Sequence, residues 1–334
     1  MIKLVFFLLL SVFSAVCSFG QTVSNVDAYQ EGKNIIITYN TDKAGSVGDV
    51  YCSTDGGRTW GEALRQVTGD VNKQVPAGGH RIVWNVLAER EKLSGANICF
   101  KVEVNSGKFT VNGVSFEMVR VEGGTFRMGA TSEQEDEADS DEKPVHSVTL
   151  SSYYIGKTEV TQALWQAVMG SNPSNFKGSD LPVGSVSWDN CQEFIQKLNR
   201  LTGRNFRLPT EAEWVFACRG GNNSCGYKYS GSNNLGSVAW YDGNSGGKSH
   251  PVGTKAPNEL GIFDMSGNVW EWCSDWYANY TSYSQTNPTG PQSGSDRVNR
   301  GGSWSNGAGN CRSSCRGDFN PADRFITIGL RLAL

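Results

Sequence analysis

The stretch 300–334 constrains the fold of this chain more than any other part. It opens with Gly301-Gly302-Ser303-Trp304 and then mixes Arg, Pro and Gly with an irregular scatter of small, acidic and aromatic residues. Residues of the turn-forming type lie at the surface and need a scaffold that holds them in place. We therefore predict that residues 305–327 form a working surface, which the preceding chain holds and displays.

Composition supports a scaffold of this kind. The 40 Gly and ten Trp among 334 residues favour a compact, loop-rich fold pinned by large aromatic side chains over a helical one. The length suffices for about two domains. The net charge of −3 gives no reason to expect a nucleic acid or an anionic membrane as a partner.

The first residues have the pattern of a targeting segment. Lys3 precedes an apolar run, 4–16, that is too short to span a bilayer, and small residues precede an expected cleavage near Gln21. Cys17 leaves lipoprotein processing open as the alternative. We therefore expect residues 1–20 to be a signal peptide and the protein to be exported to the cell surface, the periplasm or the medium. Contact with a membrane is then expected only through a lipid anchor.

Residues 21–108 have the pattern of an all-β domain. The runs 34–39, 81–84 and 98–104 are β-branched or alternate between apolar and polar residues, as strands do. Their spacing suits a small sandwich that resembles immunoglobulin or fibronectin type III modules. Residues 53–60 look like the Asp-box hairpin of sialidases, but a single copy excludes a propeller.

Beyond residue 114 the pattern becomes mixed. Strand patterns cover 116–129 and 145–150, and helices are expected to start at Thr158, Ser187 and Thr210, which can act as N-caps. The fold class predicted for the whole chain is therefore α+β.

An acidic segment and eight cysteines also bear on possible metal sites and bridges. Residues 133–142 hold seven acids in ten residues, for which we expect a solvated loop. Eight cysteines follow the targeting segment, and none forms a CxxC pair, which argues against a zinc site. A Cys52–Cys99 bridge and buried free thiols both stay open. The eight are Cys52, Cys99, Cys191, Cys218, Cys225, Cys273, Cys311 and Cys315.

From Met118 onward the chain resembles the formylglycine-generating enzyme (sulfatase-modifying factor) family. The resemblance rests on ordered motifs at residues 123–129, 144–146, 158–161, 182–183, 207–214, 267–272 and 300–304. It implies that 114–334 form a domain with a variant of the C-type lectin fold.

The same resemblance bears on catalysis. Enzymes of this family use two cysteines, five residues apart, to bind copper and oxidise a substrate cysteine. Counting from Gly301, the second position is Cys311, whereas the first is Asn306, and an amide cannot replace a soft thiolate ligand. Copper is therefore expected only if the protein is an oxidase that uses Cys311 in an altered site.

The resemblance also implies a calcium ion at the loop 267–272. The matching ligands here are the carboxylates of Asp264 and Glu271 and the carbonyls of Gly267 and Val269. Hard oxygen ligands of this kind suit Ca²⁺.

The C-terminal stretch resembles the variable region of proteins diversified by retroelements that mutate adenines. Mutation of the adenines in AAC codons gives Ser, Gly, Asp, Cys, Phe, Ile, Thr and Asn, among others, but never Lys, Glu, Gln, Met or Trp. The twelve candidate positions all belong to the permitted set: Ser305, Asn306, Gly307, Cys315, Gly317, Asp318, Phe319, Asn320, Asp323, Phe325, Ile326 and Thr327.

These observations favour an exported, non-enzymatic binding protein with a ligand-binding surface at its C-terminus. Aromatic and small polar residues on a rigid scaffold are typical of antibody-like binding surfaces. The expected ligand is a protein or a glycan on another cell or phage. The alternatives are a formylglycine-generating oxidase acting on a protein cysteine, and a structural module of the cell envelope, in which Phe325 and Ile326 are core strand residues.

Overall fold

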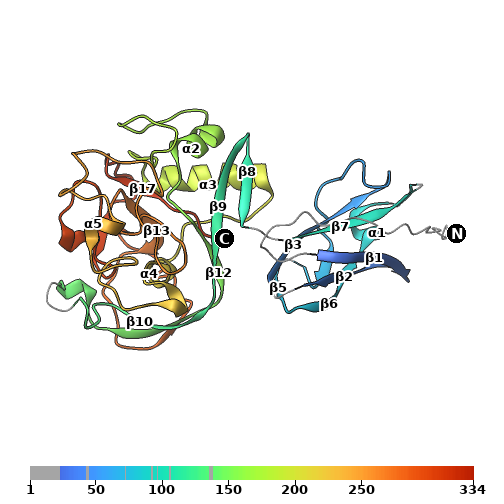
Figure 1. The fold of residues 1–334 in the computed structure, drawn as a ribbon, viewed down its shortest axis with the longest axis horizontal. Helices are drawn as coiled ribbons and strands as arrows, with labels where there is room; N and C mark the ends of the chain where they lie inside the picture. The colour runs from blue at the N-terminus through green and yellow to red at the C-terminus, as the bar shows by residue number, and fades with distance from the viewer. Residues whose placement is uncertain are drawn as a thin grey trace. The chain divides into compact units, whose positions relative to one another are not determined.

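The computed structural model describes residues 23–42, 45–71, 73–91, 93–95, 97–104, 107–134 and 138–334. The chain forms two compact units, which divide between Ser106 and Gly107 (Figure 1). The predicted signal peptide, with Cys17 and Gln21, lies outside the described residues. Among the residues that are described, no helix has both the length and the apolar character needed to cross a membrane.

The first unit is rich in β-structure. Its strands are β1 (Val23–Glu31), β2 (Asn34–Thr41), β3 (Gly45–Ser53), β4 (Val67–Gly69), β5 (Lys73–Val75), β6 (Gly78–Trp84) and β7 (Cys99–Val104), with a short helix α1 (Val86–Glu89). One sheet has the order β1-β2-β6-β4 and another the order β5-β3-β7, all antiparallel. An all-β unit was expected here; its finer likeness to immunoglobulin or fibronectin type III modules stays a prediction.

Local contacts in this unit show the role of Asp55 in the hairpin 53–60 and bear on the possible Cys52–Cys99 bridge. Asp55 Oδ1 accepts hydrogen bonds from the backbone N–H groups of Arg58 and Thr59, at 3.0 Å each, so it shapes a turn. Cys52 pairs across the strands with Phe100, whereas Cys99 pairs with Ser53. Because successive side chains of a strand point to opposite faces, the two thiols are not positioned to form a bridge. The cysteines of the described residues are all free.

The second unit combines short sheets with helices. Its strands are β8 (Lys108–Val111), β9 (Val114–Val121), β10 (Gly124–Met128), β11 (His146–Leu150), β12 (Tyr153–Gly156), β13 (Trp270–Trp276), β14 (Gln285–Thr286), β15 (Arg297–Arg300), β16 (Arg316–Phe319) and β17 (Ile328–Leu330). Its helices are α2 (Gln162–Met169), α3 (Trp188–Thr202), α4 (Glu211–Cys218) and α5 (Leu235–Val238), with 3-10 turns at Ser140–Glu142, Gly221–Asn223 and Ala308–Cys311. The α+β class is confirmed.

The sheets of this unit have the orders β12-β9-β8, β10-β11-β14 and β16-β15-β13-β17. Residues 108–111, at and just after the predicted end of the first domain, form β8 and pair with β9 inside this unit. The strands on either side of Gly123, β9 and β10, pair with different partners and do not form a hairpin. The third sheet, β16-β15-β13-β17, carries the C-terminal stretch.

Helix starts follow local capping chemistry in two of the three predicted cases. Ser187 caps α3 and Thr210 caps α4, each with a capping box. The prediction for Thr158 is wrong, because α2 begins only at Gln162 and Thr161 accepts the N–H of Leu164.

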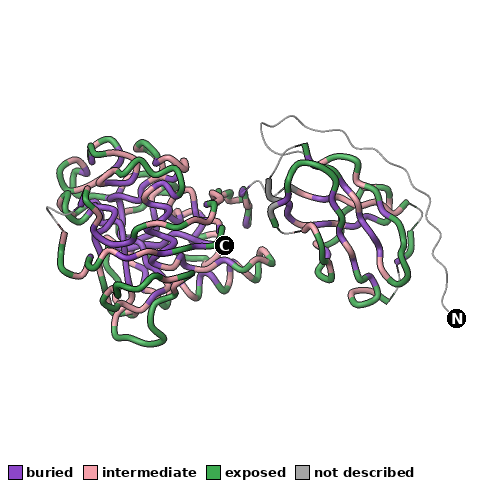
Figure 2. The backbone as a smooth tube through the Cα atoms, turned by 90° about the horizontal axis from the view of Figure 1, so that it is seen from below, coloured by how far each residue is buried: buried purple, intermediate pink, exposed green. Residues whose placement is uncertain are grey.

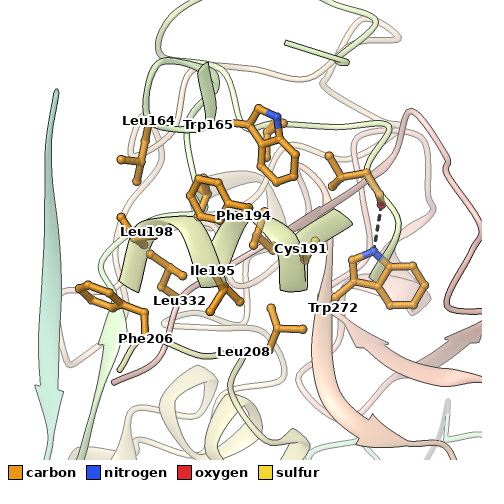
Figure 3. Packing of buried hydrophobic residues seen from close by; sticks show 14 of the residues in the cluster. Leu164, Trp165, Cys191, Phe194, Ile195, Leu198, Phe206, Leu208, Trp272 and Leu332 are labelled. Atoms are coloured by element: carbon orange, nitrogen blue, oxygen red, sulfur yellow. Dashed lines mark hydrogen bonds between the residues drawn. The ribbon is translucent and has the colours of Figure 1, made fainter. Parts of the chain in front are cut away.

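Helix α3 packs its apolar face into the main core of the second unit, where Phe194 stacks on Trp165 with ring centroids 4.8 Å apart (Figure 3). Trp272 of β13 lies in the same core and donates its indole N–H to the Val186 carbonyl at 3.0 Å. Buried residues fill the interior of this unit, and exposed residues gather in the loops around it (Figure 2). This core is the support on which the C-terminal stretch rests.

Candidate ligand-binding face

A tight glycine turn begins the C-terminal stretch. Gly301 and Gly302 follow β15 with φ angles of 100° and 74°, which side-chain-bearing residues rarely adopt. A Cβ at position 302 would also lie 2.8 Å from the Asn310 carbonyl oxygen and 2.9 Å from Cys311 Sγ. The turn therefore requires glycine at position 302, where the backbone packs directly against residues 310 and 311.

Buried arginines fix the stretch to the rest of the unit. Arg300, Arg312, Arg316 and Arg331 are all under a tenth exposed, and each bonds a buried glutamate. These glutamates lie upstream of the stretch: Glu211 contacts Arg300 at 2.5 Å and Arg316 at 2.7 Å, Glu142 contacts Arg312 at 2.6 Å, and Glu271 contacts Arg331 at 2.6 Å. Breaking one side of a buried pair costs about 3–5 kcal/mol, so the arginines form a strong frame.

Glu211 is the centre of this frame. Burial opposes its ionisation, but the charges of Arg300 and Arg316 outweigh it and lower the pKa of the carboxyl to about 2. Tyr280 also contacts the group, with its hydroxyl 3.1 Å from Glu211 Oε1. Glu211 is therefore ionised at physiological pH and binds both arginines as a charged group.

The acidic loop is only partly what the sequence predicts. Residues 135–137 lie outside the described part, but Glu142 is fully buried, not solvated. It forms a bidentate pair with Arg312, at 2.6 and 2.8 Å. The loop thus contributes an anchor to the C-terminal stretch.

The candidate positions lie mostly at the surface. Eleven of the twelve are at least partly exposed: Ser305, Asn306, Gly307, Gly317, Asp318, Phe319, Asn320, Asp323, Phe325, Ile326 and Thr327. Phe325 and Ile326 are 42% and 43% exposed, so the alternative in which they are core strand residues is wrong. We call these eleven positions the candidate face.

Cys315 is the exception. It is 3% exposed and belongs to the main core of the unit. A thiol in that position cannot meet a ligand at the surface, so the prediction that Cys315 is a binding residue is wrong. Its role is to pack.

Trp270 joins the two parts of the candidate face. Its indole Nε1 donates to Asn306 Oδ1 at 2.9 Å, and its backbone N–H donates to the Thr327 carbonyl at 2.8 Å. Its ring also lies 3.3 Å from the place where a Cβ on Gly317 would be. Residues from both parts, 305–307 and 317–327, therefore meet around one tryptophan.

Aromatic rings give this surface an apolar part. Phe319 contacts the exposed Phe325, with ring centroids 4.8 Å apart, and meets Trp272 edge-on at 6.3 Å. Exposed aromatic groups that are held by a core at one edge offer contact area at a low cost in conformational entropy. Asp318 is exposed but points to the opposite face of β16 from Phe319, and burial together with repulsion from Asp296 and Asp141 raises its pKa.

Asn306 and Cys311 occupy the positions where a formylglycine-generating oxidase would have its two copper-binding cysteines. Asn306 Oδ1 accepts hydrogen bonds from Trp270 Nε1 and from Ser303 Oγ, the latter at 2.5 Å. Cys311 is fully buried among apolar residues, and burial, followed by the nearby Cys315 and Asp242, raises the pKa of its thiol to about 12. A reactive cysteine needs a lowered pKa and access to solvent. Neither position has the properties of a reactive thiolate.

The predicted calcium ligands fit an ion only in part. Glu271 uses both carboxylate oxygens for Arg331 and also accepts the Trp214 indole N–H at 2.6 Å. Asp264 accepts the Gly253 N–H at 2.6 Å through one oxygen, and its other oxygen is buried without a partner. Across the described chain, no three side chains of the His, Cys, Asp and Glu type are grouped as a metal site.

Glu159 adds to this picture and was not expected from the sequence. Both of its carboxylate oxygens are buried without a hydrogen-bond partner. Burial, followed by the charges of Asp264 and Glu271, raises its pKa well above the usual range. Burial also raises the pKa of Asp264, to about 6. The oxygens of Glu159 and Asp264 therefore fit a cation better than Glu271 does.

Residues 106–334 match the family model described as "Sulfatase-modifying factor enzyme 1-like domain". The chain is 33% identical over 299 residues to "Chaperone protein LppX" of Paenibacillus barcinonensis, covering 75% of this chain and 98% of that protein. It is 34% identical to the "Formylglycine-generating enzyme" of Mus musculus over 52% of this chain, and it spans only 50% of the mouse enzyme.

A solved structure named "Treponema denticola variable protein 1" is similar in both sequence and fold. It is 36% identical with a TM-score of 0.61, and the match covers 68% of this chain and 97% of that one.

Proposed function

Because this chain belongs to the family of the sulfatase-modifying factor enzyme 1-like domain, we propose that it is a non-enzymatic binding protein on that fold. Its candidate face recognises a protein or glycan ligand, and the residues of this face vary between copies of the gene. We place the protein outside the cytoplasm, since residues 1–20 have the pattern of a signal peptide.

One observation carries this proposal: eleven of the twelve positions with the permitted residue types are at least partly exposed, and buried arginines fix the stretch that carries them. Arg316, Ile328, Gly329 and Arg331, which stand among or beside these positions, are buried, whereas Pro321 and Arg324 are at least partly exposed. The likeness to a protein named a variable protein supports the same interpretation.

A formylglycine-generating oxidase is the second candidate, because of the similarity to the mouse enzyme. Two residues at the expected copper site argue against this oxidase. Asn306 offers an amide where copper chemistry needs a soft thiolate, and Cys311 is buried with a raised pKa. A copper-binding and peptide-oxidation assay separates the two candidates. Copper-dependent turnover that Cys311→Ser abolishes would overturn our proposal.

A chaperone-like role is the third candidate, because the relative named a chaperone is matched over 98% of its length. The exposed Phe325 and Ile326 could contact apolar segments of a client protein. Such a protein would keep its binding residues fixed, whereas a diversified one would not. The DNA test below therefore distinguishes these two roles.

The proposal is tested at the level of the gene. We expect codons ending in C at the twelve positions, and a near-copy template rich in AAC beside a reverse transcriptase gene. An intact locus that lacks both would end the retroelement interpretation. A binding test complements it: Phe325→Asn with Ile326→Asn should abolish capture of a ligand while the melting temperature stays unchanged.

We also propose that calcium stabilises the second unit through Asp264 and Glu159. Their unpartnered buried oxygens support this, together with the carbonyls expected from Gly267 and Val269. An ion that binds only the folded state raises the melting temperature. We expect calcium to raise it relative to chelator, and Asp264→Asn to remove this effect. The exposed control Asp180→Asn should keep it, and an unshifted parent protein would refute the proposal.

A further inference from the structure

Asn299 is a buried polar residue without a partner beneath the candidate face. It lies in the middle of β15, is fully buried, and neither its Oδ1 nor its Nδ2 has a hydrogen-bond partner. An unsatisfied buried amide carries a desolvation penalty and calls for an explanation. No part of the proposed function so far uses this residue.

The strand register shows what Asn299 faces. It pairs with Trp272 of β13 on one side and with Gly317 of β16 on the other. Residues that are opposite each other across neighbouring strands point to the same face of a sheet. Asn299 is therefore adjacent to position 317, which belongs to the candidate face.

The contact between the two positions is very close. A Cβ on residue 317 would lie 2.3 Å from Asn299 Oδ1 and 3.2 Å from its Cγ. The carboxamide of Asn299 thus occupies the space that a side chain at position 317 would need. Gly317 has no unusual φ angle, so the backbone there does not itself demand glycine. The glycine is needed only while the amide stays where it is.

We propose that Asn299 is the fixed counterpart of position 317. With glycine at 317, as here, its carboxamide fills the gap between the strands. With a polar side chain at 317, the carboxamide turns aside and hydrogen-bonds that side chain, which holds it in one orientation. A preorganised side chain at the surface binds a ligand with a smaller loss of entropy.

The chemistry of asparagine suits this role. A carboxamide has both donors and an acceptor, so it can pair with the hydroxyl of Ser or Thr, the carboxylate of Asp or the amide of Asn. All four belong to the residue types that adenine mutation of AAC produces. Large apolar members of that set, such as Phe and Ile, would collide with the amide and leave it without a partner. We therefore expect position 317 to carry Gly or a small polar residue.

This inference rests on the proposed function only for the variation at position 317. The contact itself is tested by comparing Gly317→Ser with Gly317→Ala in the full chain, in the presence of Asn299 and in an Asn299→Ala background. The Ser and Ala side chains share the Cβ, so their difference isolates the hydroxyl group. Asp318→Ser and Asp318→Ala are the matched control, because residue 318 pairs with Val298 on the opposite face of the strand.

With Asn299 present, we expect Gly317→Ser to melt about 2–4 °C above Gly317→Ala, which corresponds to one hydrogen bond in a domain of this size. In the Asn299→Ala background this advantage should vanish. At position 318 the difference between Ser and Ala should be the same in both backgrounds. An advantage of Ser at 317 that persists without Asn299, or that is absent with it, would overturn the proposal.

A second measurement avoids dependence on the Asn299→Ala variant, should it fail to fold. With selectively ¹⁵N-labelled asparagine, Gly317→Ser should move the side-chain amide signals of Asn299 and give a cross-peak with the Ser side chain; unmoved signals would refute the contact. The two proposals fail in different ways. A locus without a template removes the variation but leaves this coupling, whereas an absent coupling leaves the binding face in place.

Discussion

Asp275 gives a sharp test of the electrostatics under the candidate face. It lies in β13, is 4% exposed, and accepts the Glu211 N–H at 3.0 Å and the Ser274 hydroxyl at 2.9 Å through Oδ2. Burial, followed by repulsion from the ionised Glu211, raises its pKa from 3.8 to about 7. We predict that Asp275→Asn makes the protein more stable at pH 8.

The sign follows from proton binding. Between pH of about 4 and about 7, the folded state keeps a proton on Asp275 that the unfolded state has released. The free energy of unfolding therefore falls as pH rises through this window, and the loss is complete above it. Each pKa unit corresponds to about 1.4 kcal/mol, so the loss amounts to about 4 kcal/mol. Asparagine keeps an acceptor for the Glu211 N–H and carries no charge.

Urea titration followed by tryptophan fluorescence measures this effect in the second unit, which holds eight of the ten tryptophans. We expect the variant and the parent to be equally stable at pH 4, and the variant to be more stable by up to about 4 kcal/mol at pH 8. Asp180→Asn, at an exposed site, is the matched control and should follow the parent throughout. An Asp275→Asn variant whose stability runs parallel to that of the parent between pH 4 and pH 8 would refute the reasoning.

Three further predictions concern the frame and the face. Phe325→Ala should change the free energy of unfolding by less than about 0.5 kcal/mol, whereas the nearby buried Ile328→Ala should lower it by about 2–5 kcal/mol; equal losses in urea titration would contradict the placement of the face. Arg312→Ala should cost about 3–5 kcal/mol because Glu142 stays buried and unpaired, and adding Glu142→Gln should recover part of it; a double variant no better than the single one would count against the ion pair. Under native conditions a thiol reagent should modify the exposed Cys225 rapidly and Cys311 only on unfolding, as mass spectrometry of the labelled peptides would show; fast labelling of Cys311 would reopen the oxidase interpretation.

The sequence predicted those features that depend on neighbouring residues. Ser187 and Thr210 cap their helices as expected, because the residues that complete each cap lie within the next turn. Thr158 fails for a reason that lies far along the chain. The N–H of Val160 donates to the Leu330 carbonyl, and its own carbonyl accepts the Val183 N–H, both at 2.9 Å, so the backbone of Val160 pairs with distant segments and cannot join a helix.

The charged groups of the site show the same limit. Glu142 reads as one of several acids in a polar loop, and only Arg312, 170 positions later, explains its burial. Glu271 matches a calcium ligand by its motif, but Arg331 and Trp214 occupy its oxygens in the folded chain. Residue types could be read from the sequence, whereas the partners that decide their ionisation are brought together only by the tertiary fold.

The arginine frame has a consequence for how such a protein can change over generations. Each of its ion pairs joins an arginine of the C-terminal stretch to a glutamate encoded well before it. Arginine can be written in the genetic code without any adenine, so a mutator that acts only on that base passes over it. If the gene is diversified as we propose, the surface changes many times while the ion pairs that hold the stretch are inherited intact. Most of the rewritten copies would still fold, which makes a large repertoire of surfaces affordable to the cell.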